Sequence, residues 1–315
     1  MLDINTAINT LSWQKEPLQL YAPIEYTLQS GGKRLRPTLV LLANEMFGGN
    51  QQEALHAALA IEIFHNFTLL HDDVMDKALV RRGKPTVHRQ WSENAAILSG
   101  DQMMIEAYKQ LAQLPDKQLP TVLRLFNEMA TGICEGQQYD MEFEQKQDVT
   151  LDDYLTMIRL KTAVLLAYAL QIGAYIGSAD NEQQQQLFNY GIHLGLAFQI
   201  QDDLLDVYGN PLTFGKAIGG DILCGKKTYL LLTALNKADA TTKQELTNTL
   251  TANIDDEEKI ASVRSIYDRL GVKHSAEQAI EEHTAQAIAA LQQLPQNEQN
   301  KTLYKLAQQL SNRQS

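Results

Sequence analysis

Residues 51–76 read QQEALHAALAIEIFHNFTLLHDDVMD, and this stretch indicates the fold class. Its apolar residues recur at intervals of three and four from Ala54 to Leu69, without Pro or Gly. This periodicity predicts a long helix. A second stretch of the same kind, residues 183–208, stops at Gly209-Asn210-Pro211, where Pro cannot continue a helix.

Similar patterns fill the rest of the chain, separated by short turns such as Phe47-Gly48-Gly49-Asn50. The further predicted helices cover residues 36–47, 94–113, 118–142, 151–177, 227–236, 241–252, 256–270, 275–293 and 298–311. No alternating run of β-branched and aromatic residues marks a strand. Because no linker-like stretch divides the chain, the sequence predicts a single all-α domain over residues 1–315, a bundle of ten or more helices.

The bulk composition is that of a globular protein, with 44% hydrophobic and 21% charged residues. A net charge of −11 disfavours binding to nucleic acid, whose phosphates are held by clustered Lys and Arg. Cys134 and Cys224 are too few for a disulfide framework, so we expect two packing residues in a cytoplasmic protein. The N-terminus lacks signal-peptide features and the apolar run 163–177 is short, so no membrane span is predicted.

Two acidic clusters share one pattern, Asp-Asp-x-x-Asp, at residues 72–76 and 202–206. The first and last carboxylates of each cluster are four residues apart and therefore share one helical face. Carboxylate oxygens suit Mg²⁺, which commonly bridges one or two carboxylates to substrate phosphates. The pair of clusters therefore indicates Mg²⁺ and a phosphate-bearing ligand.

A single acidic triplet on a helix is usually solvated surface. Here the triplet occurs twice, each time among apolar residues near the C-terminal end of a predicted helix. Negative charge is unfavourable at that end of the helix dipole, so neither placement stabilises the helix. A metal site explains both placements better than a solvated face does.

Basic residues next to glycines supply candidate phosphate sites in this acidic protein. Gly permits close backbone approach, Arg offers planar bidentate donors, and Lys provides a compact charge. These segments are Gly31–Pro37 (GGKRLRP), Arg81–Lys84 (RRGK), Gly215-Lys216 and Gly225–Thr228 (GKKT).

The order and spacing of these motifs resemble the trans-type polyprenyl synthetase family from about residue 30 to residue 228. Further matching segments are GQQYD at 136–140, Lys161-Thr162, FQIQDDLLD at 198–206 and FGKAIGGD at 214–221. The resemblance implies helices around a deep central cavity and a homodimer. It also implies condensation of isopentenyl diphosphate with an allylic diphosphate (dimethylallyl, geranyl or farnesyl), with release of diphosphate.

By that resemblance, Asp72, Asp76 and Asp202 are expected to ligate about three Mg²⁺ ions around the allylic diphosphate. Supporting contacts through water or hydrogen bonds are expected from Asp73, Asp203 and Asp206. Residues that match contacts to the same diphosphate are Arg81, Lys161, Gln199, Lys216 and Lys226. Dipoles near Lys161, Thr162 and Gln199 are expected to stabilise the allylic cation.

The metal-free pocket for isopentenyl diphosphate matches Lys33, Arg36, His65 and Arg82. Phe198 matches a wall for the isoprenyl tail. A lone histidine or aromatic residue on an apolar helix more often belongs to the core, so His65 and Phe198 depend on their motif context.

Product length is expected to depend on bulk along the helix that precedes Asp72, where each turn adds about 5.4 Å, close to one isoprene unit. Phe67 occupies the position at which related enzymes carry an aromatic stop, with the smaller Thr68 after it and Phe64 farther along. This pattern favours geranylgeranyl or farnesyl diphosphate, and the absence of a second aromatic residue at Thr68 slightly favours geranylgeranyl diphosphate.

Two alternatives remain open. A class I terpene synthase shares the first acidic cluster, but its second metal motif usually mixes Asn, Ser and Glu, unlike residues 202–206. A non-catalytic subunit of a heteromeric prenyl synthase would have lost aspartates, and none is lost here. The two-residue spacing within residues 72–76 does not settle the subclass.

Overall fold

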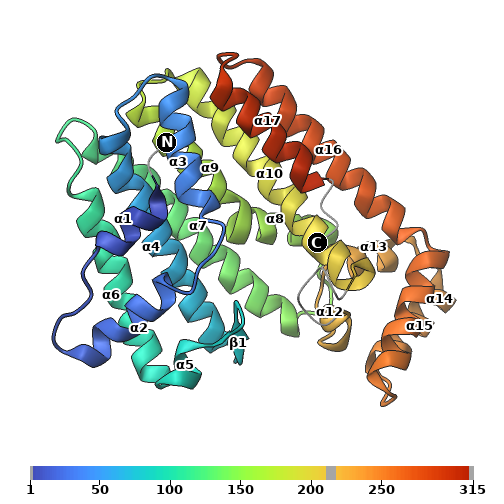
Figure 1. Ribbon diagram of the computed structural model, residues 1–315. Helices are drawn as coiled ribbons and strands as arrows, with labels where there is room; N and C mark the ends of the chain where they lie inside the picture. Colours follow the sequence, from blue (N-terminus) through green and yellow to red (C-terminus); the bar gives the residue numbers. More distant parts are fainter. Residues whose placement is uncertain (1–2, 211–217, 312–315) are drawn as a thin grey trace. The chain divides into compact units, whose positions relative to one another are not determined.

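The computed structural model describes residues 3–210 and 218–311. Helices dominate these residues, which confirms the predicted all-α fold (Figure 1). They are α1 Ile4–Thr10, α2 Leu18–Leu28, α3 Leu35–Met46, α4 Gln51–Met75, α5 Val87–Gln90, α6 Glu93–Leu111, α7 Leu119–Gln145, α8 Leu151–Ile158, α9 Val164–Ile176, α10 Asn181–Tyr208, α12 Gly220–Leu223, α13 Tyr229–Lys237, α14 Ala240–Thr251, α15 Asp256–Arg269, α16 Val272–Gln292 and α17 Glu298–Ser311.

Two elements of other kinds interrupt the helices. Between α8 and α9 the chain forms a π-helical turn, η1, at Arg159–Ala163. The strands β1 Val80–Arg81 and β2 Lys84–Pro85 form a short antiparallel hairpin in which Arg81 pairs with Lys84. Sequence periodicity predicted neither, because a strand of two residues and a single wide turn carry no period.

Internal contacts divide the chain into two compact units. The first consists of Met1–Asn127 and Tyr168–Gln185, and the second of Glu128–Ala167 and Gln186–Ser315. The single domain over residues 1–315 stays a prediction.

Helix α4 forms the centre of the first unit, where it packs against α3 and α6. It begins at Asn50, whose side chain accepts a hydrogen bond from the backbone N–H of Gln52. The ten residues 57–66 are all buried, among them Ala58, Ile61 and Ile63 at 0% exposure, so the middle of this helix is enclosed on every side. Burying such side chains contributes about 1.5–3 kcal/mol each for the larger ones, so packing on all sides stabilises this helix.

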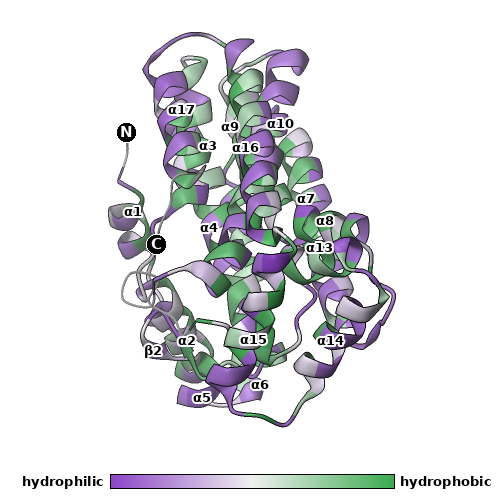
Figure 2. Cartoon of the chain, turned by 90° about the vertical axis from the view of Figure 1, so that its right-hand side faces the viewer, coloured by the Kyte–Doolittle hydropathy of each residue, from purple (hydrophilic) through white to green (hydrophobic). Residues whose placement is uncertain are grey.

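Helix α8 in the second unit begins with a capping box, in which Thr150 and Asp153 satisfy each other's backbone N–H groups. In the same unit, the Tyr190 hydroxyl on α10 donates to the carbonyl of Leu303 on α17 at 2.8 Å. Helices α16 and α17 carry hydrophilic and hydrophobic residues on different faces, as expected of amphipathic outer helices (Figure 2).

The stretch Leu151–Ile176, 26 residues long, is long and apolar enough to cross a membrane, and it is the single such helix in the described part of the chain. Inside the protein, 56% of its apolar window is buried. A core helix of a soluble protein passes the same test, so this finding is weak evidence for a span. The predicted absence of a membrane span stays a prediction.

The prediction that both cysteines are packing residues is wrong, because Cys134 and Cys224 are exposed. On α7 the buried residues next to Cys134 are Ile133 and Gly136, and one residue of helix turns the thiol about 100° away from Ile133. Cys224 is the C-cap of α12, outside the periodic pattern of any long helix.

Candidate active site

The first acidic cluster lies at the C-terminal end of α4, as predicted. The helix ends at Met75, and the backbone N–H of Asp76 still donates to the carbonyl of Asp72 at 2.8 Å. Asp72 and Asp76 are therefore one helical turn apart on the same face. Asp72 is half-buried and Asp76 is exposed, so ligands can reach both carboxylates.

Asp73 points to a different environment, because it is only 5% exposed and pairs with a basic residue. Its Oδ1 accepts a hydrogen bond from Nε of Arg81 on β1 at 2.8 Å. Burial raises the pKa of Asp73, and the positive charge of Arg81 opposes that rise. Asp73 thus orients Arg81, an arrangement consistent with the supporting role expected for this aspartate.

The hairpin turn carries Arg82 into contact with the glycine loop before α3. Arg82 and Gly83 both have positive φ, +52° and +75°, as in the type I′ turns that close two-residue hairpins. The Arg82 guanidinium donates to the carbonyl of Gly31. A Cβ on Gly32 would lie 3.0 Å from Cζ of Arg82, so the loop tolerates this guanidinium because Gly32 has no side chain.

His65 lies inside a cluster of positive charges. It is 8% exposed, and burial lowers the pKa of its imidazole well below the ordinary value of 6.5. Nearby positive charges lower the pKa further; they belong to Arg36, Arg82, Arg81 and Arg34. The imidazole is therefore neutral at physiological pH and can donate one hydrogen bond without adding charge.

Arg36 has an enclosed nitrogen with no partner among the described residues. Although part of its side chain is exposed, its Nε is buried and makes no hydrogen bond within the described chain. Burial lowers the pKa of Arg36 to about 10, while Glu62 opposes that shift. Buried donors are nearly always satisfied, so an unsatisfied guanidinium nitrogen indicates a site for an anion.

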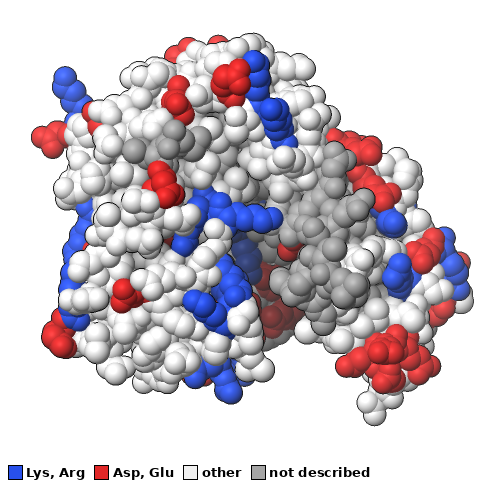
Figure 3. All heavy atoms as spheres, viewed as in Figure 1, with Lys and Arg blue, Asp and Glu red and all other residues white. Residues whose placement is uncertain are grey.

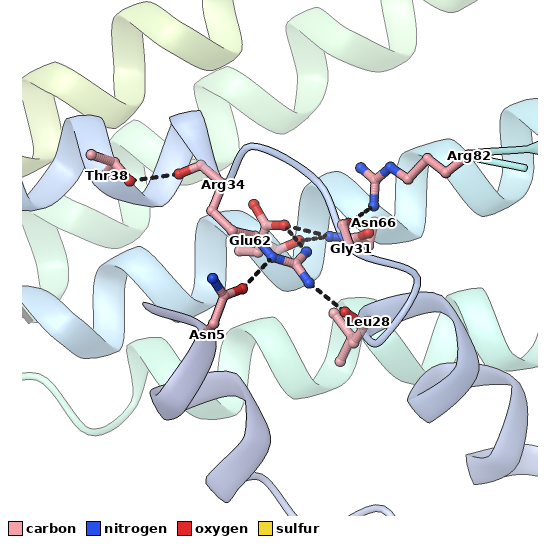
Figure 4. A network of polar contacts seen from close by, with 8 residues as sticks. All are labelled: Asn5, Leu28, Gly31, Arg34, Thr38, Glu62, Asn66 and Arg82. Atoms are coloured by element: carbon pink, nitrogen blue, oxygen red, sulfur yellow. Dashed lines mark hydrogen bonds and ion pairs between the residues drawn. The ribbon is translucent and has the colours of Figure 1, made fainter. Parts of the chain in front are cut away.

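A buried network of polar side chains lies beside this cluster (Figure 4). The sequence analysis gave no role to this network. The Arg34 guanidinium donates to Glu62 Oε1 and to the carbonyl of Leu28, with side-chain exposures of 6% for Arg34 and 3% for Glu62. Asn66 Nδ2 donates to Glu62 Oε1 at 2.9 Å. Glu62 thus supplies the negative charge that offsets neighbouring arginines. The sequence signal for it was an acidic residue inside an apolar run.

A pocket in the first unit reaches the same residues, since Asn66, Asp73, Arg81 and Arg82 are among those that line it. Asn66 Oδ1 is buried and has no partner among the described residues.

Lys33, a predicted diphosphate contact, is exposed in the loop before α3. Lys and Arg side chains gather on the visible face of this unit (Figure 3).

Two of the predicted chain-length residues, Phe64 and Phe67, belong to a cluster of tilted and edge-to-face aromatic rings in the first unit. The ring of Phe64 lies 5.3 Å from that of Phe67 and 5.1 Å from that of Phe126. Phe64 is buried, whereas Phe67 and Thr68 are half-buried. The Thr68 hydroxyl donates to the carbonyl of His65 at 2.8 Å. Since Phe64 is buried and Phe67 is half-buried, Phe67 is the more accessible of the two phenylalanines.

The second acidic cluster lies near the C-terminal end of α10 in the second unit. Asp203 is 5% exposed and accepts hydrogen bonds from the Tyr154 hydroxyl and, at 3.0 Å, from the backbone N–H of Tyr229. Burial raises the pKa of Asp203 to about 6, while these donors and Lys226 oppose the rise. Asp202 and Asp206 are half-buried. Oδ2 of Asp206 accepts from the backbone N–H of Asp221 at 3.0 Å.

The π-turn places Lys161 and Thr162 against polar residues of two neighbouring helices. Nζ of Lys161 lies 2.5 Å from Oδ2 of Asp140 on α7. The Thr162 hydroxyl donates to Oε1 of Gln199 on α10 at 3.1 Å. Asp140 ends the GQQYD segment, but sequence analysis gave it no role.

The remaining predicted residues are placed less specifically. Lys226 is exposed, and Phe198 is half-buried on α10. Lys216 lies outside the described residues, so its predicted contact with a diphosphate stays a prediction.

The acidic clusters offer oxygen donors alone, which suits Mg²⁺ and not a thiolate or imidazole site. Within residues 3–210 and 218–311, no three acidic, His or Cys side chains converge on one metal position. Mg²⁺ sites that bind substrate phosphates commonly need only one or two carboxylates, because phosphates and water complete the shell. The donor set therefore fits Mg²⁺ together with a diphosphate, and the individual ligands stay predictions.

Comparisons with known proteins agree with these features. The family model described as "Polyprenyl synthetase" matches residues 17–269. A short chain isoprenyl diphosphate synthase of Methanothermobacter thermautotrophicus is 37% identical, covering 92% of this chain and 89% of that protein. A geranylgeranyl pyrophosphate synthase of Geoglobus acetivorans is 39% identical, covering 88% and 86%. The crystal structure of geranylgeranyl pyrophosphate synthetase from Pyrococcus horikoshii has a TM-score of 0.93 at 35% identity, covering 98% and 95%.

Proposed function

Because the chain belongs to the polyprenyl synthetase family and is a prenyltransferase, we propose that it condenses isopentenyl diphosphate with an allylic diphosphate to form geranylgeranyl diphosphate. The observation that carries the proposal is the cationic cluster of the first unit. There a neutral His65 and the enclosed Nε of Arg36 lie close to Arg82. Such fixed donors suit a diphosphate held without metal, as isopentenyl diphosphate requires.

The reaction breaks the bond between the allylic carbon and its diphosphate oxygen. Asp72, Asp76 and Asp202 would hold Mg²⁺, which supplies positive charge for the departing diphosphate. Arg81 and Lys161 add fixed positive charge for the same group, and Asp73 and Asp140 hold these two side chains in place. Thr162 and Gln199 contribute dipoles toward the allylic cation, which the double bond of isopentenyl diphosphate attacks.

The released diphosphate is the proposed proton acceptor when the new double bond forms. No side chain of this protein is assigned as a general base. His65 is a weak base here, since burial and the surrounding arginines lower its pKa. It acts in substrate binding instead.

For product length we propose geranylgeranyl diphosphate over farnesyl diphosphate. Relatives named geranylgeranyl diphosphate synthase support this choice, among them that of Methanosarcina mazei at 40% identity. The half-buried Phe67, followed by the smaller Thr68, supports a stop at an intermediate length. A relative from Natronomonas pharaonis, 34% identical, is named geranylfarnesyl diphosphate synthase, so the product analysis must also include that longer product.

We further propose that the protein is a cytoplasmic homodimer. Helix α6 supports the dimer, because Leu98 and Ile105 are 59% and 49% exposed and lie seven residues apart on one stripe of the helix. Large exposed apolar residues on one stripe favour association with another protein surface. Size-exclusion chromatography with light scattering should give twice the chain mass of 35.3 kDa. A mass equal to that of one chain would contradict the proposed homodimer.

The decisive experiment incubates purified protein with Mg²⁺, radiolabelled isopentenyl diphosphate and each allylic starter in turn, followed by product analysis. We expect geranylgeranyl diphosphate and no turnover in excess chelator. The Asp72→Asn and Asp202→Asn variants should each lose about 10²–10³-fold in kcat. The Asp116→Asn variant, at an exposed position in the turn after α6, should retain activity.

Two outcomes would overturn the proposal. Consumption of an allylic diphosphate without isopentenyl diphosphate, giving a hydrocarbon or alcohol, would indicate a terpene synthase. Activity only after mixing with another protein would indicate a subunit of a heteromeric synthase.

A further inference from the structure

Two glycines, one on α7 and one on α10, lie against the backbone of the π-turn η1. In η1 the backbone N–H of Val164 donates to the carbonyl of Arg159, a span of five residues that widens the helix. Gly136 on α7 faces one side of this turn, where an added Cβ would lie 2.3 Å from the backbone nitrogen of Lys161. Gly195 on α10 faces Ala163, where an added Cβ would lie 2.5 Å from Cα.

Each helix also contacts a polar side chain of η1, through a residue four positions after its glycine. On α7, Asp140 follows Gly136 by four residues and pairs with Nζ of Lys161 at 2.5 Å. On α10, Gln199 follows Gly195 by four residues and accepts from the Thr162 hydroxyl at 3.1 Å. Each helix thus makes one backbone contact through a glycine and one side-chain contact through a polar residue.

We propose that Gly136 and Gly195 are positioning residues of the condensation reaction: they set the depth at which α7 and α10 approach the π-turn, and thereby the positions of the Lys161 ammonium and the Thr162 hydroxyl. This inference rests on the proposed roles of those two side chains. Neither glycine touches substrate. Both act through the turn.

The distances explain why these positions are sensitive. Contacts below 3.0 Å involve backbone atoms of Lys161 and Ala163, which cannot rotate away as the end of a flexible side chain can. A methyl group at Gly136 must therefore displace either α7 or the turn. Because Asp140 lies on the same rigid helix, its contact with Lys161 shifts together with the helix. A misplacement of about 1 Å can lower a reaction rate by about 10²-fold.

Helix α7 also supplies a matched control. Gly132 lies one turn before Gly136, and a Cβ there would make ordinary contacts of 3.5 Å and 3.6 Å with the side chains of Leu160 and Val164. Gly132→Ala therefore changes the same residue type on the same helix without a backbone collision. Ala is also the better helix former.

The experiment compares Gly136→Ala, Gly195→Ala and Gly132→Ala in steady-state kinetics, with thermal unfolding of each variant. We expect kcat to fall about 10- to 100-fold in the first two, with a small change in KM for isopentenyl diphosphate. Diphosphate release should exceed product formation in these two variants, because a misplaced Lys161 or Thr162 lets water capture part of the allylic cation, which leaves as the allylic alcohol. Gly132→Ala should match wild type in kcat and in the ratio of released diphosphate to product, and its midpoint of thermal unfolding should be equal to or higher than that of wild type.

A double-mutant cycle separates positioning from loss of structure. If Gly136 acts through Lys161, then Gly136→Ala should lower kcat little further in a Lys161→Ala background. Additive losses would overturn the proposal, as would wild-type kinetics in the folded Gly136→Ala and Gly195→Ala variants. Failure of both variants to fold would assign the glycines a structural role only. If wild-type protein itself shows no condensation, the proposed function fails rather than this inference.

Discussion

The hydroxyl of Tyr154 on α8 donates a hydrogen bond to the carboxylate of Asp203 on α10, and both side chains are buried. Burial raises the pKa of Asp203, and this hydrogen bond opposes part of that rise. It also fixes the middle carboxylate of the second acidic cluster, next to the predicted metal ligand Asp202. A residue of α8, far from any acidic motif in the sequence, thus orients that motif.

Removal of this hydroxyl should affect both stability and catalysis. Tyr154→Phe leaves the Asp203 carboxylate one donor short, which should lower the free energy of unfolding by about 1.5–3 kcal/mol, the range for hydrogen bonds to charged groups. We also expect kcat to fall, because Asp203 is adjacent to Asp202. Urea unfolding and steady-state kinetics measure the two effects.

Tyr190→Phe is the matched control, since Tyr190 is also buried and its hydroxyl bonds the carbonyl of Leu303 instead. It should lose stability but keep kcat. Equal kcat in the two variants would contradict a catalytic role for the Tyr154 contact.

The buried pair between Arg34 and Glu62 should be important for folding of the first unit. Glu62→Gln removes the charge that Arg34 faces, and breaking a buried pair from one side costs about 3–5 kcal/mol. Urea unfolding followed by circular dichroism measures this loss. The exposed pair of Arg269 and Glu245 is the control, with side chains 56% and 46% exposed. Glu245→Gln should change the free energy of unfolding by less than about 1 kcal/mol. Similar decreases in the free energy of unfolding in both variants would contradict this prediction.

Phe67→Ala should lengthen the product by removing half-buried bulk beside Phe64. Radiolabelled products, dephosphorylated and separated by chain length, give the measurement. Phe143→Ala, which removes a buried aromatic residue of the second unit, controls for a general loss of packing and should leave product length unchanged. Unchanged length in Phe67→Ala would remove this residue from the role.

His65 should make the protein less stable in mild acid. Its folded-state pKa lies well below 6.5, chiefly through burial, so on acidification the unfolded chain binds a proton there before the folded chain does. The stability contributed by neutral His65 is present above pH 6.5 and is lost as pH falls below it. One such proton lowers the free energy of unfolding by about 1.4 kcal/mol between about pH 7.5 and about pH 5.5.

Urea midpoints at the two pH values, for wild type and for His65→Gln, test this prediction. The variant should lose that part of the pH dependence. The exposed His274→Gln variant should retain it. A wild-type pH dependence in His65→Gln would show that another group is responsible.

Helical periodicity identified the long helices within a few residues, as at α4 and α10, because residues three and four apart lie on the same side of a helix. It did not identify α2, which contains Pro23 and lies between Pro17 and Gly31. The acidic and basic motifs were likewise visible in the sequence, since their residue types together with their repetition, order and spacing indicate metal and phosphate chemistry.

The partners of those motifs depended on tertiary structure. Tyr154 meets Asp203, and Glu62 meets Arg34, across 49 and 28 residues of sequence. Neither pair has a spacing that a local pattern could reveal. The widening of the helix at Arg159–Ala163 and the glycines that enclose it are also invisible locally, because a backbone approach is a property of two helices and not of one. The local sequence therefore predicts the helices and the chemistry of the motifs. The hydrogen bonds that orient the functional groups form only when distant segments pack together.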